Sequence, residues 1–281
     1  MPNRPFQATS ALLLVGIQLL AAVGVLLLGA AASRGESVAA VFLAAAPLVA
    51  PLVALYVGLV RYAPDEPTAA ALRFSRPDAA GWGLVGLALI AGAAMSPVLL
   101  VLQEQMLSLF PAEPIAPELE NELRAALEEP ATVLFLTLTQ VAFGPLAHEA
   151  LFRGLMQPRL VAAHGMKRGL WITVFLYAAA QMSPRFLPLA LLVALPLGVI
   201  ALAARTTWAP VAAHLAMGAA PYVAAAVGQP FVDLESGAST VPLWLVLASA
   251  VVAAGTLWLI WRGRRSVAPA GDGGGAQGGE R

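Results

Sequence analysis

The 281-residue sequence contains no cysteine, and this absence excludes several kinds of site. Without a thiol the chain can form no disulfide, no thiolate nucleophile and no cysteine-ligated metal centre. Histidine is scarce, with only three copies, so histidine chemistry has very few positions to use. The formal net charge is zero, and the sequence has no cluster of lysine and arginine of the kind that indicates a nucleic-acid partner.

Charged residues are also few. They make up 11% of the chain, whereas about a quarter of a typical soluble domain is charged. Hydrophobic residues make up 59%, and the mean hydropathy is +0.79. Apolar runs of about 20 residues, the length that crosses a bilayer, recur along the whole chain. The sequence therefore predicts an integral membrane protein whose main partner is the lipid bilayer.

The apolar runs predict an all-α, polytopic membrane helix bundle of about eight transmembrane helices, because backbone polar groups in hydrocarbon must pair within helices. The bundle takes residues 1–262, and the glycine-rich tail 263–281 is predicted to be disordered. The first run exceeds the apolar region of a signal peptide, so we interpret it as an uncleaved span. The predicted spans, in chain order, are Ala8–Ala32, Val38–Val60, Ala80–Leu102, Ala131–Leu155, Leu170–Met182, Phe186–Ala204, Pro210–Val227 and Val241–Trp261.

Lysine and arginine predict the orientation of the bundle, because they concentrate in cytoplasmic segments. With a cytoplasmic N-terminus, all but three of the 16 basic residues fall on the inside; the three outside are Arg34, Arg124 and Arg185. We therefore predict that both termini are cytoplasmic, and the composition fits a bacterial plasma membrane.

The predicted outside loop 104–130 carries seven glutamates and, in its second half, leucines spaced four residues apart. This spacing indicates a short amphipathic helix. Such a helix would rest on the bundle or the headgroups, or it would act as a lid that selects substrates.

Polar side chains inside the predicted spans mark the candidate site, because they are costly in a bilayer. They are Gln140, His148, Glu149, Arg153, Gln181 and His214. Glu149 and Arg153 lie four residues apart, a spacing that lets them pair across one helical turn. In one interpretation Arg153 reaches the interface and Glu149 only neutralises it. In the other, the deeply placed Glu149 acts as a general base.

His148 and His214 lie at a depth in the membrane similar to that of Glu149. Two imidazoles and a carboxylate on two helices could bind a metal such as zinc. Adjacent residues point about 100° apart on a helix, so His148 and Glu149 diverge unless a kink at Pro145 brings them together. The alternative for His214 is a histidine that is hydrogen-bonded to a neighbouring backbone carbonyl.

Two short motifs carry a resemblance to a known family. Pro145, Glu149 and the Phe-Arg-Gly at 152–154, followed by Trp-Ala-Pro-x-x-x-His at 208–214, resemble the CPBP intramembrane metalloproteases. This family includes the CAAX prenyl proteases and bacteriocin-processing or immunity membrane proteins. The resemblance covers about 131–222. It implies a site near the cytoplasmic side, a metal that activates water beside a carboxylate, and a membrane-embedded or prenylated peptide substrate.

The sequence departs from the family pattern at three of its four catalytic positions. The pattern is Glu-Glu-x-x-x-Arg, then an aromatic residue with histidine four positions later, then His-x-x-x-Asn/Asp. His148 stands for the first glutamate, Gln181 for the first histidine when Tyr177 is taken as the aromatic residue, and Gly218 for the last Asn/Asp. The positions that match the pattern are Glu149, Arg153 and His214.

Three functions remain open, and the sequence does not decide whether the chain is an enzyme. Glutamine is a poor zinc ligand and no base, and Gly218 has no side chain, so we favour impaired or lost proteolysis with a scaffold, binding or immunity-type role. The second is an active metallopeptidase with a rearranged site of His148, Glu149 and His214. The third is a small-solute transporter, which inverted repeats would favour; we find no such symmetry.

Overall fold

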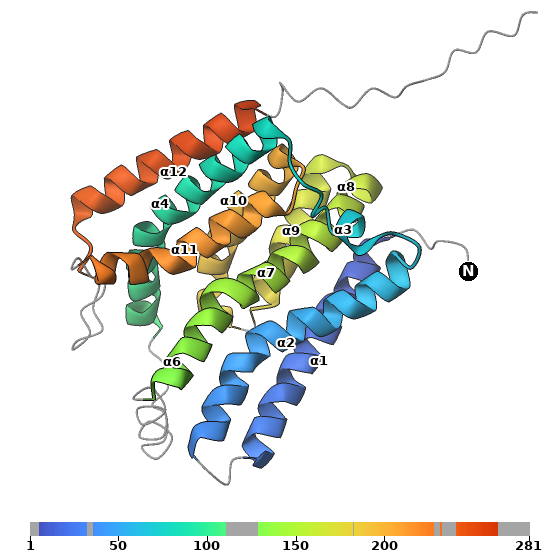
Figure 1. Ribbon diagram of the computed structural model, residues 1–281, viewed down its shortest axis with the longest axis horizontal. Helices are drawn as coiled ribbons and strands as arrows, with labels where there is room; N and C mark the ends of the chain where they lie inside the picture. Colours follow the sequence, from blue (N-terminus) through green and yellow to red (C-terminus); the bar gives the residue numbers. More distant parts are fainter. Residues whose placement is uncertain are drawn as a thin grey trace, which may run out of the picture.

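The computed structural model describes residues 6–32, 36–110, 129–181, 183–227, 231 and 240–263. All regular elements in these ranges are helical, which confirms the predicted all-α bundle (Figure 1). The predicted disordered tail lies outside the described residues, apart from its first position, Gly263, which ends the last helix.

The helices follow the predicted spans closely. In chain order they are α1 (Ala8–Ala32), α2 (Glu36–Tyr62), α3 (Thr68–Ala71), α4 (Ala79–Leu109), α6 (Pro130–Thr137), η1 (Leu138–Phe143), α7 (Gly144–Glu149), η2 (Ala150–Met156), α8 (Gln157–His164), α9 (Met166–Ala179), η3 (Pro184–Phe186), α10 (Leu187–Ala204), α11 (Trp208–Ala226) and α12 (Leu243–Gly263).

Seven helical stretches in the described part are long and apolar enough to cross a membrane. The fifth predicted span, Leu170–Met182, is not among these seven; it corresponds to α9, which has 14 residues. At 1.5 Å per residue, α9 is about 21 Å long, shorter than the hydrocarbon core of about 30 Å. The chain is thus a multi-pass membrane protein with seven full-length spans in the described part and one short helix.

The third span continues beyond its predicted end. The helix α4 runs to Leu109, so Glu104 is helical and does not begin a loop. Asp78 caps its first turn, because its carboxylate accepts a hydrogen bond from the Gly81 amide at 2.7 Å. The leucine-striped half of the predicted acidic loop lies outside the described residues.

The elements α6 to α8 form one continuous helical rod from Pro130 to His164. Two stretches of wider π-helix, η1 and η2, interrupt it on either side of α7. Such bulges re-aim side chains and are frequent at functional sites. The rod ends at Gly165, whose φ of 78° suits glycine, and α9 then turns back along α8.

The helices α1 and α2 pair on one flank of the bundle, and α4 and α12 pair on the other, with the rod and α9 to α11 between them (Figure 1). Close contact between α4 and α11 requires small residues. A Cβ atom at Gly92 would collide with the carbonyl oxygen of Ala213 on α11, and Ala88, one turn earlier, is fully buried. Ala88 and Gly92 lie four residues apart, the spacing of small residues that lets membrane helices pack closely.

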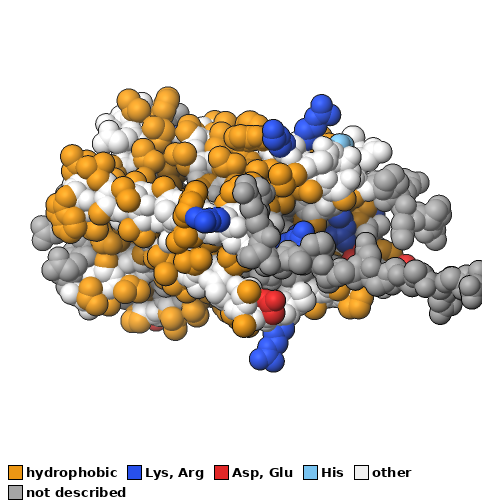
Figure 2. All heavy atoms as spheres, turned by 90° about the horizontal axis from the view of Figure 1, so that it is seen from above, with side chains coloured by type: hydrophobic (Ala, Val, Ile, Leu, Met, Phe, Trp, Pro, Cys, Tyr) orange, Lys and Arg blue, Asp and Glu red, His pale blue; other side chains and the backbone are white. Residues whose placement is uncertain are grey.

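The surface matches a bilayer environment. In Figure 2 hydrophobic side chains cover one end of the visible face, while lysine and arginine side chains lie over its middle and other end. Many large hydrophobic residues are exposed, including Leu20, Tyr56 and Val251, each at least 69% accessible. Lipid tails satisfy such a surface, whereas water would not.

Candidate functional site

The junction of α7 and η2 places the first motif in the middle of the bundle. Glu149 and Arg153 are 0% and 1% exposed, although both are charged residues. The following Gly154 allows the backbone at the end of α3 to approach, because a Cβ there would stand 2.7 Å from the Leu72 carbonyl oxygen. The Phe-Arg-Gly sequence therefore has a packing role at its glycine.

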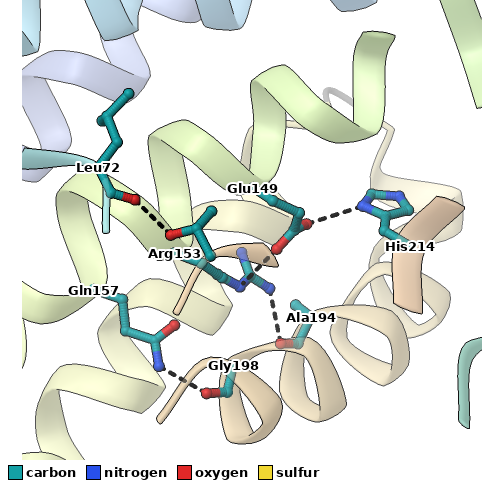
Figure 3. Close-up of polar contacts among 8 residues, drawn as sticks. Leu72, Glu149, Arg153, Gln157, Ala194, Gly198 and His214 are labelled. Carbon is teal, nitrogen blue, oxygen red and sulfur yellow. Dashed lines mark hydrogen bonds and ion pairs between the residues drawn. The ribbon is translucent and has the colours of Figure 1, made fainter. Parts of the chain in front are cut away.

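Glu149 is held between two basic side chains (Figure 3). Its Oε1 accepts a hydrogen bond from Nδ1 of His214 on α11 at 2.9 Å. Its Oε2 lies 3.5 Å from Nε of Arg153, as the four-residue spacing predicts. The predicted pair is thus formed, and the structure adds His214 to it from 65 positions away in the sequence.

Arg153 and Gln157 continue this polar face of the rod toward α10. Arg153 donates from Nη2 to the Ala194 carbonyl at 2.8 Å, and Gln157 donates from Nε2 to the Gly198 carbonyl at 2.8 Å (Figure 3). Both donors and both acceptors are spaced by four residues, so each turn of the rod meets one turn of α10. Tyr177 on α9 lies against the guanidinium, with Cζ of Arg153 4.6 Å from the ring centroid.

His148 points away from this network toward α1. Its Nδ1 lies 2.9 Å from the Gly144 carbonyl oxygen, and this nitrogen must donate because a carbonyl only accepts. In a neutral ring Nε2 then accepts, here from the side-chain amide of Gln18 at 3.4 Å. The adjacent residues His148 and Glu149 therefore serve different neighbours.

A cavity of about 230 Å³ lies on the His148 side. Its polar lining residues are Gln18, His148 and Gln181, and the rest of the lining is apolar, including Ala46 and Ala50 of α2. Gln18 is 3% exposed, and its Oε1 has no hydrogen-bond partner. Gln18 thus places a buried acceptor without a donor beside the cavity.

The two remaining motif positions lie apart from the ion pair. Gln181 follows the end of α9 and lines the cavity with His148. Gly218 lies one turn beyond His214 on α11, and a Cβ there would meet Val141 at ordinary contact distance, 3.7 Å. Gly218 is therefore not required by close packing.

The residues present fit a catalytic zinc ion poorly. Both histidines direct Nδ1 to an oxygen atom, as many metal-bound imidazoles do, and Nε2 would be the metal-binding nitrogen, but Nε2 of His148 is already 3.4 Å from the Gln18 amide. A catalytic zinc takes three protein ligands, however, and the described residues contain no group of three or more histidine, aspartate or glutamate side chains placed to share an ion. Glu149, the carboxylate beside His214, already contacts Arg153 with one oxygen and His214 with the other.

Sequence reasoning missed three residues of this region. Gln18 lies in the apolar first span, where a single amide was the only signal. Gln157 follows Arg153 by four residues, so the same periodicity predicts that it lies on the same face of the helix as Glu149 and Arg153. Tyr177 was considered only as the aromatic residue of the second motif, although it contacts Arg153.

Comparison with protein families matches residues 130–220 to the family described as type II CAAX prenyl endopeptidase Rce1-like. The match runs from the start of α6 into α11 and contains all of the motif positions. It confirms the resemblance to the CPBP and CAAX proteases that the two motifs indicate. Neither the comparison with curated proteins nor that with solved structures found a match.

Proposed function

We propose that this chain is a CPBP-type membrane protein that binds a ligand at the motif region and does not cleave it. The observation that carries this proposal is the position of Glu149, which is fully buried between Arg153 and His214. A general base must reach the water that it deprotonates, directly or through one further water. A side chain with no exposed surface and a basic group at each oxygen lacks that access.

The glutamate, arginine and histidine then serve the structure. An ion pair in a low-dielectric interior is stabilised by partners for its remaining polar atoms. His214 and the Ala194 carbonyl supply one such partner for each member of the pair, whereas Nη1 of Arg153 forms no hydrogen bond within the described part of the chain and the guanidinium lies over the Tyr177 ring. The network therefore fixes the rod against α10 and α11.

Ligand binding is assigned to the cavity beside His148. Gln18, His148 and Gln181 are uncharged hydrogen-bonding groups in an apolar lining, which suits a neutral polar ligand. A peptide segment within the membrane carries polar backbone groups, and the side chains of Gln18, His148 and Gln181 that line the cavity are of the kind that can hydrogen-bond to them. The ligand that we propose is accordingly a membrane-embedded peptide, in a scaffold or immunity-type role at a bacterial plasma membrane.

An active metallopeptidase is the second candidate, and one observation favours it. Nε2 of His214 forms no hydrogen bond with a described residue, while Nδ1 is oriented by a carboxylate, as in a carboxylate–histidine–metal triad. In that case zinc would bind at the rearranged site of His148, Glu149 and His214, where Glu149 already contacts His214.

Bound zinc decides between the two candidates. We would purify the wild-type chain in detergent, load it with zinc, remove the excess and measure the zinc content by mass spectrometry. A variant that restores the family pattern, His148→Glu/Gln181→His/Gly218→Asn, is the positive control. We expect no stoichiometric zinc in the wild type and a gain of zinc in the restored variant.

A further variant, His214→Ala, tests whether any zinc found in the wild type is bound at this site. Near-stoichiometric zinc in the wild type that disappears in His214→Ala would support the metallopeptidase and refute the binding role. Zinc that persists in His214→Ala would instead lie elsewhere on the protein and would not bear on this site.

A further inference from the structure

A second cavity, separate from the motif region, lies between α1 and α9. This α1–α9 groove has a volume of about 580 Å³ and is lined by Ala8 and Leu12 of α1 and, on α9, chiefly by Lys167, Arg168, Trp171 and Phe175. Its size is within the range of sites that bind small molecules. The site residues described above do not line it.

The α9 side of the groove is graded from charged to apolar. Lys167, Trp171 and Phe175 follow one another at intervals of four residues, so they form a strip of about 12 Å along one face of the helix. Both rings are exposed, Trp171 by 48% and Phe175 by 57%, and their centroids lie 5.8 Å apart. On the α1 side Leu12 is 58% exposed, which continues the apolar surface.

The charged end of the groove has no counter-charge in the described part of the chain. Lys167 and Arg168 are both exposed, and neither forms an ion pair with a described residue. They also stand in the first turn of α9, where the helix dipole is positive and favours an anion. A negative group at this end would complement both side chains and the helix terminus.

We propose that the α1–α9 groove binds a phospholipid with an anionic headgroup. The phosphate would lie between Lys167 and Arg168, and an acyl chain would follow Trp171 and Phe175 between the two helices. A free phosphate would leave the apolar strip uncovered, and a zwitterionic lipid would bring a cation toward two cations. An anionic lipid matches the whole groove, and basic pockets between transmembrane helices are a known setting for such headgroups.

Native mass spectrometry tests this site with defined lipids. The detergent-purified chain would be mixed with equal amounts of phosphatidylglycerol and phosphatidylcholine of the same acyl composition. We expect one phosphatidylglycerol to be retained in preference by about thirtyfold, because each basic side chain contributes about a factor of five toward an anionic headgroup. The variant Lys167→Gln/Arg168→Gln should bring the two lipids to near parity.

The matched control is Arg61→Gln/Arg76→Gln, which removes the same charge from two exposed positions outside the groove. It should keep the wild-type preference, and thermal unfolding of both variants would verify that they fold. Equal retention of both lipids by the wild type, or an equal loss in the control, would overturn the proposal. Competition by water-soluble glycerol 3-phosphate would also overturn it, since the headgroup alone would then suffice.

Discussion

The substitution Glu149→Gln separates a structural carboxylate from a catalytic one. Glutamine has nearly the same shape, so the change removes the charge and leaves Arg153 buried with no counter-ion. Removing one member of a buried ion pair typically costs about 3–5 kcal/mol, because the other charge stays uncompensated. A catalytic base whose charge is not needed for packing would cost little on removal.

The expected loss is large enough to measure by thermal unfolding in detergent. One kcal/mol shifts the midpoint by about 2–4 °C for a chain of this size, so the predicted loss corresponds to roughly 6–20 °C. Tryptophan fluorescence is a suitable signal, since the chain has six tryptophans.

The matched control is Glu66→Gln, the same substitution in an exposed ion pair. Glu66 lies 3.3 Å from Nη2 of Arg159, and its side chain is 53% exposed. Exposed pairs contribute about 0–1 kcal/mol, so we expect a midpoint within a few degrees of the wild type. The contrast between the two variants isolates burial as the cause.

The double variant Glu149→Gln/Arg153→Met completes a thermodynamic cycle. Removing both charges leaves no unpaired ion, so the double variant should be more stable than the sum of the single changes predicts, by about 0.5–3 kcal/mol. Additive single effects, or a Glu149→Gln midpoint within about 2 °C of the wild type, would refute the structural role of the pair.

Two other predictions test the packing and the orientation. Gly92→Ala should destabilise the chain by about 1–3 kcal/mol, because its Cβ would collide with the Ala213 carbonyl, whereas Gly218→Ala, which has room for a Cβ, should cause no loss in the same denaturation assay. Because the chain has no cysteine, the single variants Asp65→Cys and Leu109→Cys can report its topology in the membrane. We expect a membrane-impermeant thiol reagent applied outside intact cells to label only the cysteine at position 109. Labelling at position 65 alone would show that the predicted orientation is reversed.

The spans could be predicted from the sequence because each depends on one local property, a long apolar run. The first span, Ala8–Ala32, has the same limits as α1. The third was predicted too short, since hydropathy falls at Gln103 and Glu104 while backbone hydrogen bonding continues to Leu109, just before Pro111. Hydropathy reports the lipid boundary, and the helix end is set by the backbone.

The site could be predicted only where its contacts are local. The four-residue spacing predicts the pairing of Glu149 with Arg153, and both are found together. The contacts of His214 with Glu149 and of Gln18 with His148 join residues 65 and 130 positions apart. No periodicity within one helix encodes such contacts, which depend on how α1 and α11 pack against the rod.

The divergence of His148 and Glu149 explains how one motif can hold two environments. On one side of the rod, Glu149, Arg153 and His214 form a charged network with no exposed carboxylate surface. On the other, His148 faces an uncharged cavity with the buried amide of Gln18. The Tyr177 ring lies beside both, with its centroid 6.0 Å from that of His148 and 6.4 Å from that of His214, but His148 forms no hydrogen bond with the ion pair. The ion pair thus has a packing role of its own in joining the rod to α10 and α11, so keeping Glu149 and Arg153 does not by itself imply that a chain retains peptidase activity.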